Sequence, residues 1–502
     1  MIKSIPDALE QTAARFGERL AFCSDTEESS YASFTAEAKA IGSFLLHRGL
    51  EKKNVAVFID KSVNCLRAMF GAAFANACYT VLDVTSPADR LNSILGTLRP
   101  ACVIVDKKSA RKWKLEGQTI YAVEDMLTEE PDEGLLAKVR AARCDTDPLY
   151  ILFTSGSTGE PKGTVICHRS VLAYASTVIA TFGVDETTVW GSQTPLYFSM
   201  SVLDVFTSVL CGAEFRIIPK MYFSFPVMLM EYLNEKKINA IYWVPSAMGI
   251  VANFNTFDEI RPEHLKLVLF AGEVMPVKQL KIWRRALPEA LFANLYGPTE
   301  ITDTCTYFIV DRDFADTESL PIGVPFDNCD VLVLREGGGR VLPGSDESGE
   351  LCVRGSFLGL GYYRNPEKTA AVFTQNPLNS AYPECIYHTG DLVSYNERGE
   401  LLYLGRKDFQ IKHMGYRIEL GEIEANIGAI EGVGECACVY ENSQIILFYQ
   451  SPTVGEEAMQ QEIKSRLLAY MRPSLVYRLP ALPHNANGKI DRKALKAGLK
   501  LS

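Results

Sequence analysis

The chain has 502 residues, of which 47% are hydrophobic and 22% charged, and its formal net charge is −10 at pH 7. This length is too great for one ordinary core and predicts several domains of a globular protein. The acidic balance argues against a broad nucleic-acid-binding surface. No apolar run reaches the roughly 18 residues that a membrane span needs, and no export signal opens the chain. We therefore expect a cytoplasmic protein with neither a nucleic-acid nor a membrane partner.

The 13 cysteines and six histidines are dispersed along the chain. No CxxC pair occurs, and the cysteines nearest to each other are Cys436 and Cys438. This pattern is typical of reduced, buried thiols and predicts neither a disulfide framework nor a zinc site. The histidines likewise predict no metal cluster.

Helix and strand patterns alternate over much of the chain. In chain order we expect helices in 1–16 and 36–50, a strand at 54–59, a helix at 61–76, strands at 77–82, 100–106 and 149–153, a helix at 168–182, and strands at 188–194, 215–219, 240–244, 265–271 and 290–295. Such alternation predicts βαβ units and a parallel sheet. From 321 to 403 the sequence turns β-rich, with a hairpin tip at 337–339.

A domain boundary is expected near 405–408, because the pattern changes there. Strands are expected at 410–412, 434–440 and 444–449, and helices at 420–430 and 456–469. This last part, of about 95 residues, is long enough for a small α+β domain. We predict an α/β fold with a large core, residues 1–406, made of α/β subdomains and a β-rich subdomain, and a C-terminal domain, residues 409–502.

The loop Thr154–Gly163, TSGSTGEPKG, follows the apolar strand pattern at 149–153. Glycines and small hydroxyl residues can turn several backbone N–H groups and hydroxyls toward one anion, and Lys162 adds a positive charge. The alternative is a polar surface loop. Because the Walker A pattern is absent, the loop predicts phosphate binding without implying a P-loop ATPase or kinase fold.

Four further motifs follow this loop: YGPTE at 296–300, YHTGD at 387–391, GRKDFQIKHMGYRIELGEIE at 405–424 and NGKID at 487–491. In this order and spacing, the five stretches resemble the ANL superfamily of adenylate-forming enzymes, which contains acyl-CoA synthetases, adenylation domains of nonribosomal peptide synthetases and luciferases. The resemblance covers nearly the whole chain. GYRIELGEIE and NGKIDR are most similar to the peptide-synthetase branch, in particular to freestanding enzymes such as D-alanine–carrier-protein ligases.

The resemblance implies a ligase that uses ATP and Mg²⁺ in two steps. The carboxylate of a small acid attacks the α-phosphorus, which forms an acyl-AMP and releases pyrophosphate, and a thiol then takes the acyl group. The implied acceptor is the phosphopantetheine of a separate carrier protein, and coenzyme A is the alternative. A catalytically idle scaffold of the same fold is a third reading, but Lys489, Glu300 and Asp391 are all retained.

The resemblance also assigns roles to residues. Lys489 bridges the attacking carboxylate and the α-phosphate, Thr299 lies near the α-phosphate, and Glu300 is the Mg²⁺ ligand. The implied ATP-binding residues are Thr154, Ser155, Gly156, Ser157, Thr158, Gly159, Lys162, Gly272, Glu273, Asn294, Tyr296, Gly297, Asp391, Tyr403 and Arg406. Residues 407–408 match a hinge, centred on Asp408, about which the C-terminal domain rotates. The side that faces the thiol is implied to contain Lys412, Gly415 and Arg417.

One position departs from the pattern of amino-acid-activating relatives, which have an aspartate that pairs with the α-ammonium of the substrate. Here that position is Ser199, within Phe198-Ser199-Met200-Ser201. Asp303 aligns with another pocket position and can supply the missing charge from a different direction; the alternative is a turn cap. The other implied pocket residues are Phe198, Met200, Leu203, Trp243, Ser246, Leu269, Ala271, Leu295 and Thr304. We hypothesise a substrate whose donor group lies away from the α-carbon, such as an aminobenzoate, a hydroxybenzoate or a β-amino acid, with an ordinary α-amino acid as the competitor.

Overall fold

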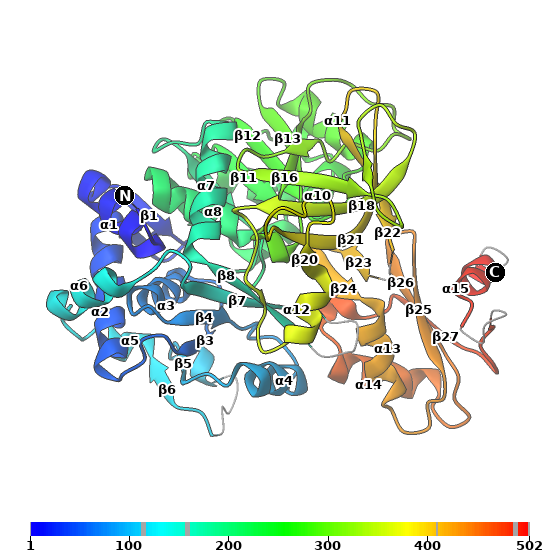
Figure 1. Cartoon of the computed structure of the whole chain (residues 1–502), viewed down its shortest axis with the longest axis horizontal. Coiled ribbons are helices and arrows are strands. Elements are labelled where there is room, and N and C mark those ends of the chain that lie inside the picture. The colour runs from blue at the N-terminus through cyan, green and yellow to red at the C-terminus, as the bar shows by residue number, and fades with distance from the viewer. Residues whose placement is uncertain (1, 112–116, 156–160, 408–409, 485–489, 500–502) are drawn as a thin grey trace. The chain divides into compact units, whose positions relative to one another are not determined.

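The structure is a computed structural model that describes all residues except 1, 112–116, 156–160, 408–409, 485–489 and 500–502 (Figure 1). Its contacts divide the chain into two units. The first contains Met1–Val84, Leu98–Leu152 and Gly163–Gly405, and the second contains Thr85–Thr97, Phe153–Lys162 and Arg406–Ser502. Among the described residues, no helix is both long and apolar enough to cross a membrane. The site residues predicted from sequence that lie outside the described part are Gly156, Ser157, Thr158, Gly159, Asp408 and Lys489.

A nine-stranded sheet of the first unit has the order β15-β14-β13-β12-β11-β9-β10-β1-β2. Its strands are β1 (Leu20–Cys23), β2 (Glu28–Ser30), β9 (Val189–Ser192), β10 (Glu214–Ile217), β11 (Ala240–Trp243), β12 (Leu267–Ala271), β13 (Leu291–Tyr296), β14 (Thr306–Ile309) and β15 (Val324–Pro325). Neighbours from β13 to β1 are parallel. Strands such as LVLFA are buried throughout, as expected for a parallel sheet that is covered on both faces.

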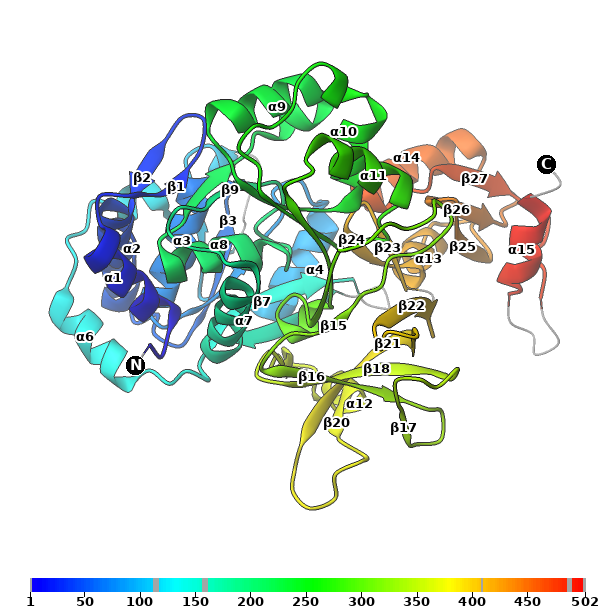
Figure 2. The ribbon, with the colours of Figure 1, turned by 90° about the horizontal axis from the view of Figure 1, so that it is seen from above.

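Helices cover both faces of this sheet. Figure 2 shows α9 (Pro226–Glu235), α10 (Pro245–Asn253) and α11 (Val277–Ala286) grouped together, apart from α7 (His168–Phe182) and α8 (Ser201–Cys211). The Trp243 ring on β11 contacts the Trp283 ring on α11. The adjacent Tyr242 instead shares a partner with Tyr174 of α7, because both hydroxyls donate to the Asp303 carboxylate. Because successive strand residues point to opposite faces, α7 and α11 lie on opposite sides.

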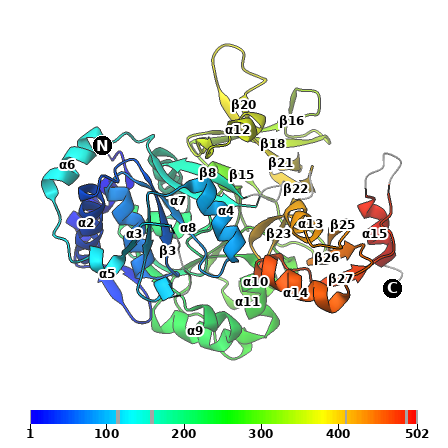
Figure 3. The ribbon, with the colours of Figure 1, turned by 90° about the horizontal axis from the view of Figure 1, so that it is seen from below.

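A seven-stranded sheet has the order β19-β8-β7-β4-β3-β5-β6. Its strands are β3 (Asn54–Phe58), β4 (Cys78–Val81), β5 (Cys102–Val105), β6 (Ile120–Ala122), β7 (Pro148–Thr154), β8 (Lys162–Cys167) and β19 (Gly361–Tyr362). The associated helices are α1 (Ile5–Phe16), α2 (Tyr31–His47), α3 (Val63–Phe74), α5 (Val123–Met126) and α6 (Glu133–Ala142). Figure 3 shows α2 and α3 beside β3. A Cβ at Gly71 would lie 2.2 Å from a methyl of Ile41, so glycine permits the close approach of α2 and α3.

The predicted β-rich region forms a third sheet, in the order β17-β16-β18-β21-β20, and β22 also pairs with β21. Its elements are β16 (Cys329–Leu334), β17 (Arg340–Val341), β18 (Ser348–Gly355), α12 (Pro366–Val372), β20 (Phe373–Gln375), β21 (Cys385–Tyr395) and β22 (Leu401–Arg406). The predicted hairpin tip at 337–339 is confirmed, since it connects β16 to β17 and all three glycines have positive φ.

The second unit contains most of α4 (Ala88–Leu98) and the C-terminal elements (Figure 3). These are the hairpin of β23 (Gln410–His413) and β24 (Tyr416–Glu419), then α13 (Leu420–Gly428), β25 (Cys436–Glu441), β26 (Gln444–Tyr449), α14 (Glu456–Arg466), β27 (Leu475–Arg478) and α15 (Arg492–Leu499). The strands β25, β26 and β27 form one sheet. The predicted fold class, α/β with several sheets and a smaller α+β part, is confirmed.

A buried histidine makes the stability of this fold depend on pH. His168 begins α7, and its Nδ1 accepts a hydrogen bond from the Ile5 N–H at 3.2 Å. Burial, followed by the positive charge of Arg143, lowers the pKa of His168 to about 3. The neutral ring therefore contributes stability above its unfolded pKa of about 6.5, and this contribution is lost as the pH falls toward 3.

We expect His168 to lower the free energy of unfolding by about 2 kcal/mol when the pH falls from 7 to 5. The measurement is urea unfolding at both pH values, compared with His168→Asn, which keeps an acceptor for Ile5 without a group that titrates in this range. The difference in the free energy of unfolding between pH 7 and pH 5 should be smaller in His168→Asn than in the parent protein. It should stay the same in His264→Asn, a change at a partly exposed histidine. Equal pH dependence in all three proteins would contradict the expectation.

Candidate active site

Three of the predicted pocket residues, Leu269, Ala271 and Leu295, share a face on neighbouring parallel strands. Tyr242 on β11 pairs with Leu269 on β12, which pairs with Ala293 on β13, and Ala271 pairs with Leu295 two residues further along. Because side chains alternate, Tyr242, Leu269, Ala271 and Leu295 share one face. The carboxyl ends of such strands are where ligand sites form in open α/β sheets.

Trp243 lies on the opposite face from these residues. Its ring centroid is 6.3 Å from that of Trp283 and 5.1 Å from that of Phe223, and its Nε1 donates a hydrogen bond to the Gly191 carbonyl at 2.8 Å. Among the residues of β11, Tyr242 therefore lies with the predicted pocket residues, and Trp243 belongs to the core beneath α11.

Asp303 is the centre of a buried hydroxyl cluster. It is 2% exposed, and its Oδ2 accepts hydrogen bonds from the Tyr174 hydroxyl at 2.8 Å and the Tyr242 hydroxyl at 3.1 Å. The Tyr174 oxygen is also 2.8 Å from Thr304 Oγ1. Burial, and after it the Asp303 charge, raises the pKa of both tyrosines well above their usual range, so they remain neutral donors. The structure thus places Asp303 inside the protein as a hydrogen-bonded carboxylate and not as a solvent-exposed turn cap.

A strained turn carries Asp303. A Cβ at Gly297 would lie 2.4 Å from the Asp303 carbonyl oxygen, so only glycine lets the turn fold back on the end of β13. Thr302 is β-branched yet has φ 78°, and its Oγ1 donates to the Phe357 carbonyl at 2.8 Å. Such a backbone costs about 1–3 kcal/mol and is typical of functional sites, where the surroundings hold one residue in place.

The position that departs from the amino-acid-activating pattern lies beside a predicted catalytic residue. Ser199 is buried, and its Oγ accepts a hydrogen bond from Thr299 Oγ1 at 3.2 Å. Of the predicted pocket residues that follow it, Met200 and Leu203 are buried at the start of α8. Ser246 is exposed, and its N–H donates to Glu273 Oε2 at 2.8 Å, so Glu273 fixes the start of α10.

Glu300, the predicted Mg²⁺ ligand, is fully buried. Its Oε1 accepts a hydrogen bond from the Tyr362 hydroxyl at 2.6 Å, and its backbone carbonyl accepts one from Gly359 at 2.9 Å. A buried carboxylate is stable only when hydrogen bonds or cations compensate its charge. The carboxylate oxygens, the burial and the fixed backbone fit a hard divalent cation that also takes phosphate oxygens.

The residues predicted to bind adenosine come from β13, β21 and β22. The Tyr296 hydroxyl donates a short hydrogen bond to Asp391 Oδ2, and the Tyr403 ring centroid is 6.2 Å from that of Tyr296. Burial, and after it the Asp391 charge, raises the pKa of Tyr296. Because a carboxylate offers about four acceptor sites, Asp391 keeps capacity for ribose hydroxyls. Asn294 is buried and donates to the Pro321 carbonyl at 2.8 Å, while Gly272 adopts φ 91° directly after β12.

In the second unit, the start of the predicted phosphate loop contacts β24. Ser155 Oγ donates to the Arg417 carbonyl at 2.6 Å and accepts from the Glu419 N–H at 3.3 Å. Phosphate binding by Ser155 therefore requires its hydroxyl to change partners. The neighbouring Thr154 Oγ1 is buried and has no hydrogen-bond partner among the described residues, as expected for a group whose ligand is a phosphate. Lys162 starts β8 and is partly exposed.

The residues predicted for the thiol side lie on one hairpin. Lys412 on β23 pairs with Arg417 on β24, and the two-residue turn between the strands is Met414-Gly415. Both turn residues have positive φ, 51° and 80°, which matches the twist of a tight hairpin. Arg406 ends β22 at the start of this unit.

Comparison with known proteins identifies the class. Residues 9–363 match the family model described as AMP-binding enzyme, and the chain belongs to this family, within the ANL superfamily. It is therefore an adenylate-forming ligase that uses ATP.

Individual relatives match over nearly their whole length. The chain is 33% identical to the L-proline–[L-prolyl-carrier protein] ligase of Streptomyces coelicolor, over 96% of this chain and 94% of the relative. It is 28% identical to the D-alanine–D-alanyl carrier protein ligase of Lacticaseibacillus casei, over 99% of both chains. Its fold is similar to the Vibrio cholerae adenylation domain AlmE in complex with glycyl-adenosine-5'-phosphate, with a TM-score of 0.86, 22% identity, and coverage of 100% of this chain and 98% of that one.

Tyr362→Phe tests the support of Glu300. Loss of this hydrogen bond should raise the concentration of Mg²⁺–ATP that gives half-maximal pyrophosphate exchange by about tenfold, since a hydrogen bond to a charged group contributes about 1.5–3 kcal/mol. Tyr363→Phe is the matched control, because that hydroxyl accepts instead from Asn54 Nδ2 at 2.6 Å. If both variants behave like the parent protein, Tyr362 does not support the nucleotide site.

Proposed function

We propose that this ligase activates a small carboxylic acid that carries an amino group, and then transfers the acyl group to the phosphopantetheine thiol of a separate carrier protein. The names of the relatives from S. coelicolor and L. casei support a carrier protein as the acceptor. Coenzyme A is the other thiol acceptor that the fold accommodates.

The first step joins two anions and therefore depends on charge compensation and alignment. Thr154 and Lys162 bind the β- and γ-phosphates. Asp391 accepts hydrogen bonds from the ribose hydroxyls, and Tyr296 and Tyr403 flank the adenosine. Glu300 holds the Mg²⁺, which when bound neutralises phosphate charge. Thr299 contacts the α-phosphate, and Lys489 stabilises the charge that develops between the carboxylate and the α-phosphorus. Pyrophosphate leaves, and the acyl-AMP remains; the thiolate then attacks its acyl carbon, which forms the thioester and releases AMP.

The buried Asp303 carboxylate is the observation that carries the substrate proposal. An amino acid held in the usual way needs a carboxylate at the position of Ser199, which here offers only a hydroxyl already bonded to Thr299. Asp303 instead supplies a negative charge among Tyr174, Tyr242 and Thr304. The substrate is accordingly an acid with an ammonium or amino group away from the α-carbon, such as a β-amino acid or an aminobenzoate. An ordinary α-amino acid is the second candidate, favoured by the proline and D-alanine ligases among the relatives.

None of the 13 cysteines, all of which the structure describes, forms a disulfide, which supports a reducing compartment and hence a cytoplasmic location.

Substrate-dependent pyrophosphate exchange tests this proposal. The panel holds α-amino acids of both hands, β-alanine, aminobenzoates, hydroxybenzoates and short fatty acids. We expect the strongest exchange with a β-amino or aminobenzoic acid. Strongest exchange with an α-amino acid would support the second candidate, and exchange with fatty acids alone would contradict any role for an amino group.

The acceptor is tested separately, by mass spectrometry of the acylated product. With the best acid, a phosphopantetheinylated carrier should be acylated, and the same carrier without its prosthetic group should not. Equal or faster acylation of coenzyme A would show that the protein is a CoA ligase.

A further inference from the structure

A cluster of three potential metal ligands lies on the third sheet, although the sequence predicted none. Cys352 on β18 pairs directly with His388 on β21, and Glu350 lies two residues before Cys352. His388 Nδ1 is 3.3 Å from Cys352 Sγ and 3.0 Å from Glu350 Oε2. Among the described residues, these three ligand atoms all lie within 4.8 Å of one another. Cys352 and His388 are 36 positions apart, so the cluster is hidden in the sequence, and strand register brings the ligands together.

The ligand types select the metal. A cysteine, a histidine and a carboxylate form a typical zinc ligand set, whereas Mg²⁺ prefers oxygen ligands alone. Zinc bonds of about 2.0–2.3 Å place tetrahedral ligand atoms about 3.4–3.6 Å apart. The two observed separations, from His388 Nδ1 to Cys352 Sγ and to Glu350 Oε2, are therefore within a few tenths of an ångström of those that a bound ion needs.

The histidine ring is already oriented for this role. Its Nε2 is 3.1 Å from Thr374 Oγ1, on the adjacent strand β20. A hydrogen bond from Nε2–H to this hydroxyl leaves the Nδ1 lone pair directed at Cys352 and Glu350. A zinc-bound histidine likewise donates its other ring N–H to an oxygen, which fixes the orientation of the ring. The site is shielded on one side and open on the other: Cys352 is fully buried with Leu332, Leu334 and Ile386, while the Glu350 and His388 side chains are 14% and 26% exposed.

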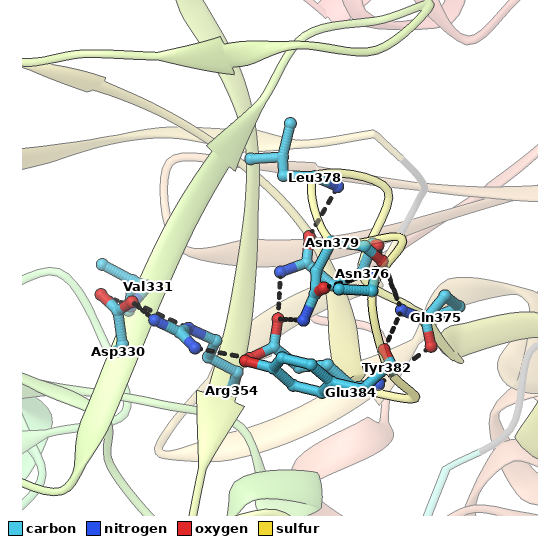
Figure 4. Close-up of polar contacts among 10 residues, drawn as sticks. Asp330, Val331, Arg354, Gln375, Asn376, Leu378, Asn379, Tyr382 and Glu384 are labelled. Carbon is cyan, nitrogen blue, oxygen red and sulfur yellow. Dashed lines mark hydrogen bonds and ion pairs between the residues drawn. The ribbon is translucent and has the colours of Figure 1, made fainter.

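The surrounding strands are held by a polar network (Figure 4). Arg354, two residues beyond Cys352 on β18, contacts Asp330 Oδ2 of β16 at 2.9 Å and Glu384 Oε1 at 2.5 Å. Asn376 Nδ2 donates in turn to Glu384 at 2.5 Å. This network connects β18, which carries Cys352, to β16 and to the residue before β21, and it pairs the Arg354 guanidinium with two carboxylates.

We propose that Glu350, Cys352 and His388 bind a zinc-type divalent ion with a fourth position open to water, at a site distinct from that of Mg²⁺–ATP. Binding releases the Cys352 thiol proton to solvent and forms the metal–thiolate bond. Glu350 also connects the site to the nucleotide residues, because its Oε1 accepts from the Gly390 N–H at 3.0 Å. Gly390, at φ 75°, lies in the bulge where β21 shifts register and re-aims Asp391.

Cobalt titration of the full-length, chelator-treated protein in excess Mg²⁺ tests the proposal. We expect one equivalent of Co²⁺ to bind with a thiolate-to-cobalt absorption band, and Zn²⁺ to displace it. Cys352→Ala should abolish the band and weaken binding at least tenfold, whereas Cys385→Ala, which removes an exposed thiol at the start of β21, the strand of His388, should change neither. His388→Gln should also weaken binding at least tenfold. This second variant tests the proposal independently if Cys352→Ala does not fold. Absence of the band in the parent protein, or unchanged binding in Cys352→Ala or His388→Gln, would overturn the proposal.

Discussion

Lys489→Ala should lower the rate of acyl-AMP formation by about 100- to 1,000-fold, the usual cost of removing one preorganised charge that stabilises the transition state. The residue lies outside the described part of the structure, so this expectation rests on the NGKID motif and on the chemistry of the step. Two anions approach each other when a carboxylate attacks an α-phosphate, and an ammonium between them stabilises the developing charge more than the ground state. Pyrophosphate exchange with the best acid of the panel measures the effect.

The second half-reaction provides the contrast. When chemically prepared acyl-AMP is supplied, Lys489→Ala should still acylate the carrier within a few-fold of the parent rate, because the thiolate attacks the acyl carbon, AMP leaves, and no carboxylate has to approach the α-phosphorus in that step. Lys493→Ala, a change at an exposed lysine of α15, should leave both half-reactions intact. Equal loss in both half-reactions would mean that Lys489 maintains the fold or the acceptor site, and not the adenylation chemistry.

The alternation of strands and helices predicted a parallel sheet, and the structure has parallel strand pairs in two separate sheets. The helix at 168–182 and the strand at 444–449 agree with α7 and β26 at both ends, because each has a clean apolar period and a clear stop, such as Gly183 in left-handed geometry after α7. The helices α9, α10 and α11 received no prediction. All three begin at or next to a proline, and the apolar residues of α9 and α10 do not form a narrow stripe, so their periodicity is weak.

Motifs predicted which residues carry chemistry but not how each is supported. Glu300, Tyr296 and Asp391 were found as parts of contiguous motifs, whereas Tyr362, which donates to Glu300, belongs to no motif and lies 62 residues away. Tyr174 and Tyr242 had detectable signals: Tyr174 lies on the buried face of α7 with Val171, Ala175 and Val178, and strict alternation on β11 opposes Tyr242 to Trp243. Their shared hydrogen-bond acceptor, Asp303, lies far from both tyrosines in the sequence, so no local pattern indicates that the three residues meet.

The nucleotide side and the acid side of the site meet at Thr299. Its hydroxyl donates to Ser199, at the start of the pocket, while its backbone begins the short helix that holds Glu300. A carboxylate in place of Ser199 would put a negative charge next to the attacking carboxylate, and it would need the substrate ammonium to compensate it. With serine there, that requirement disappears, and in the proposed function the charge that selects the substrate is that of Asp303 instead.

Asp303→Asn should lower kcat/KM for the preferred amino-bearing acid by about 100- to 4,000-fold, because removing one partner of a buried ion pair costs about 3–5 kcal/mol. Asparagine keeps the size of the side chain and an acceptor for Tyr174 and Tyr242, so the thermal unfolding temperature should change little. With acids of the panel that lack an amino group, the variant should react at least as fast as the parent protein does. The measurement is pyrophosphate exchange across the whole panel, with thermal unfolding as the check on the fold.

Tyr242→Phe is the matched variant for this argument, because it removes one hydrogen bond but leaves the carboxylate in place. The loss should be about tenfold, in line with a hydrogen bond to a charged group, and the order of preferred acids should stay the same. If Asp303→Asn instead slows every acid equally, Asp303 serves only to hold the two tyrosines. The ammonium of the substrate, if there is one, would then bind elsewhere, and the backbone carbonyls near Ser199 would be the first groups to examine.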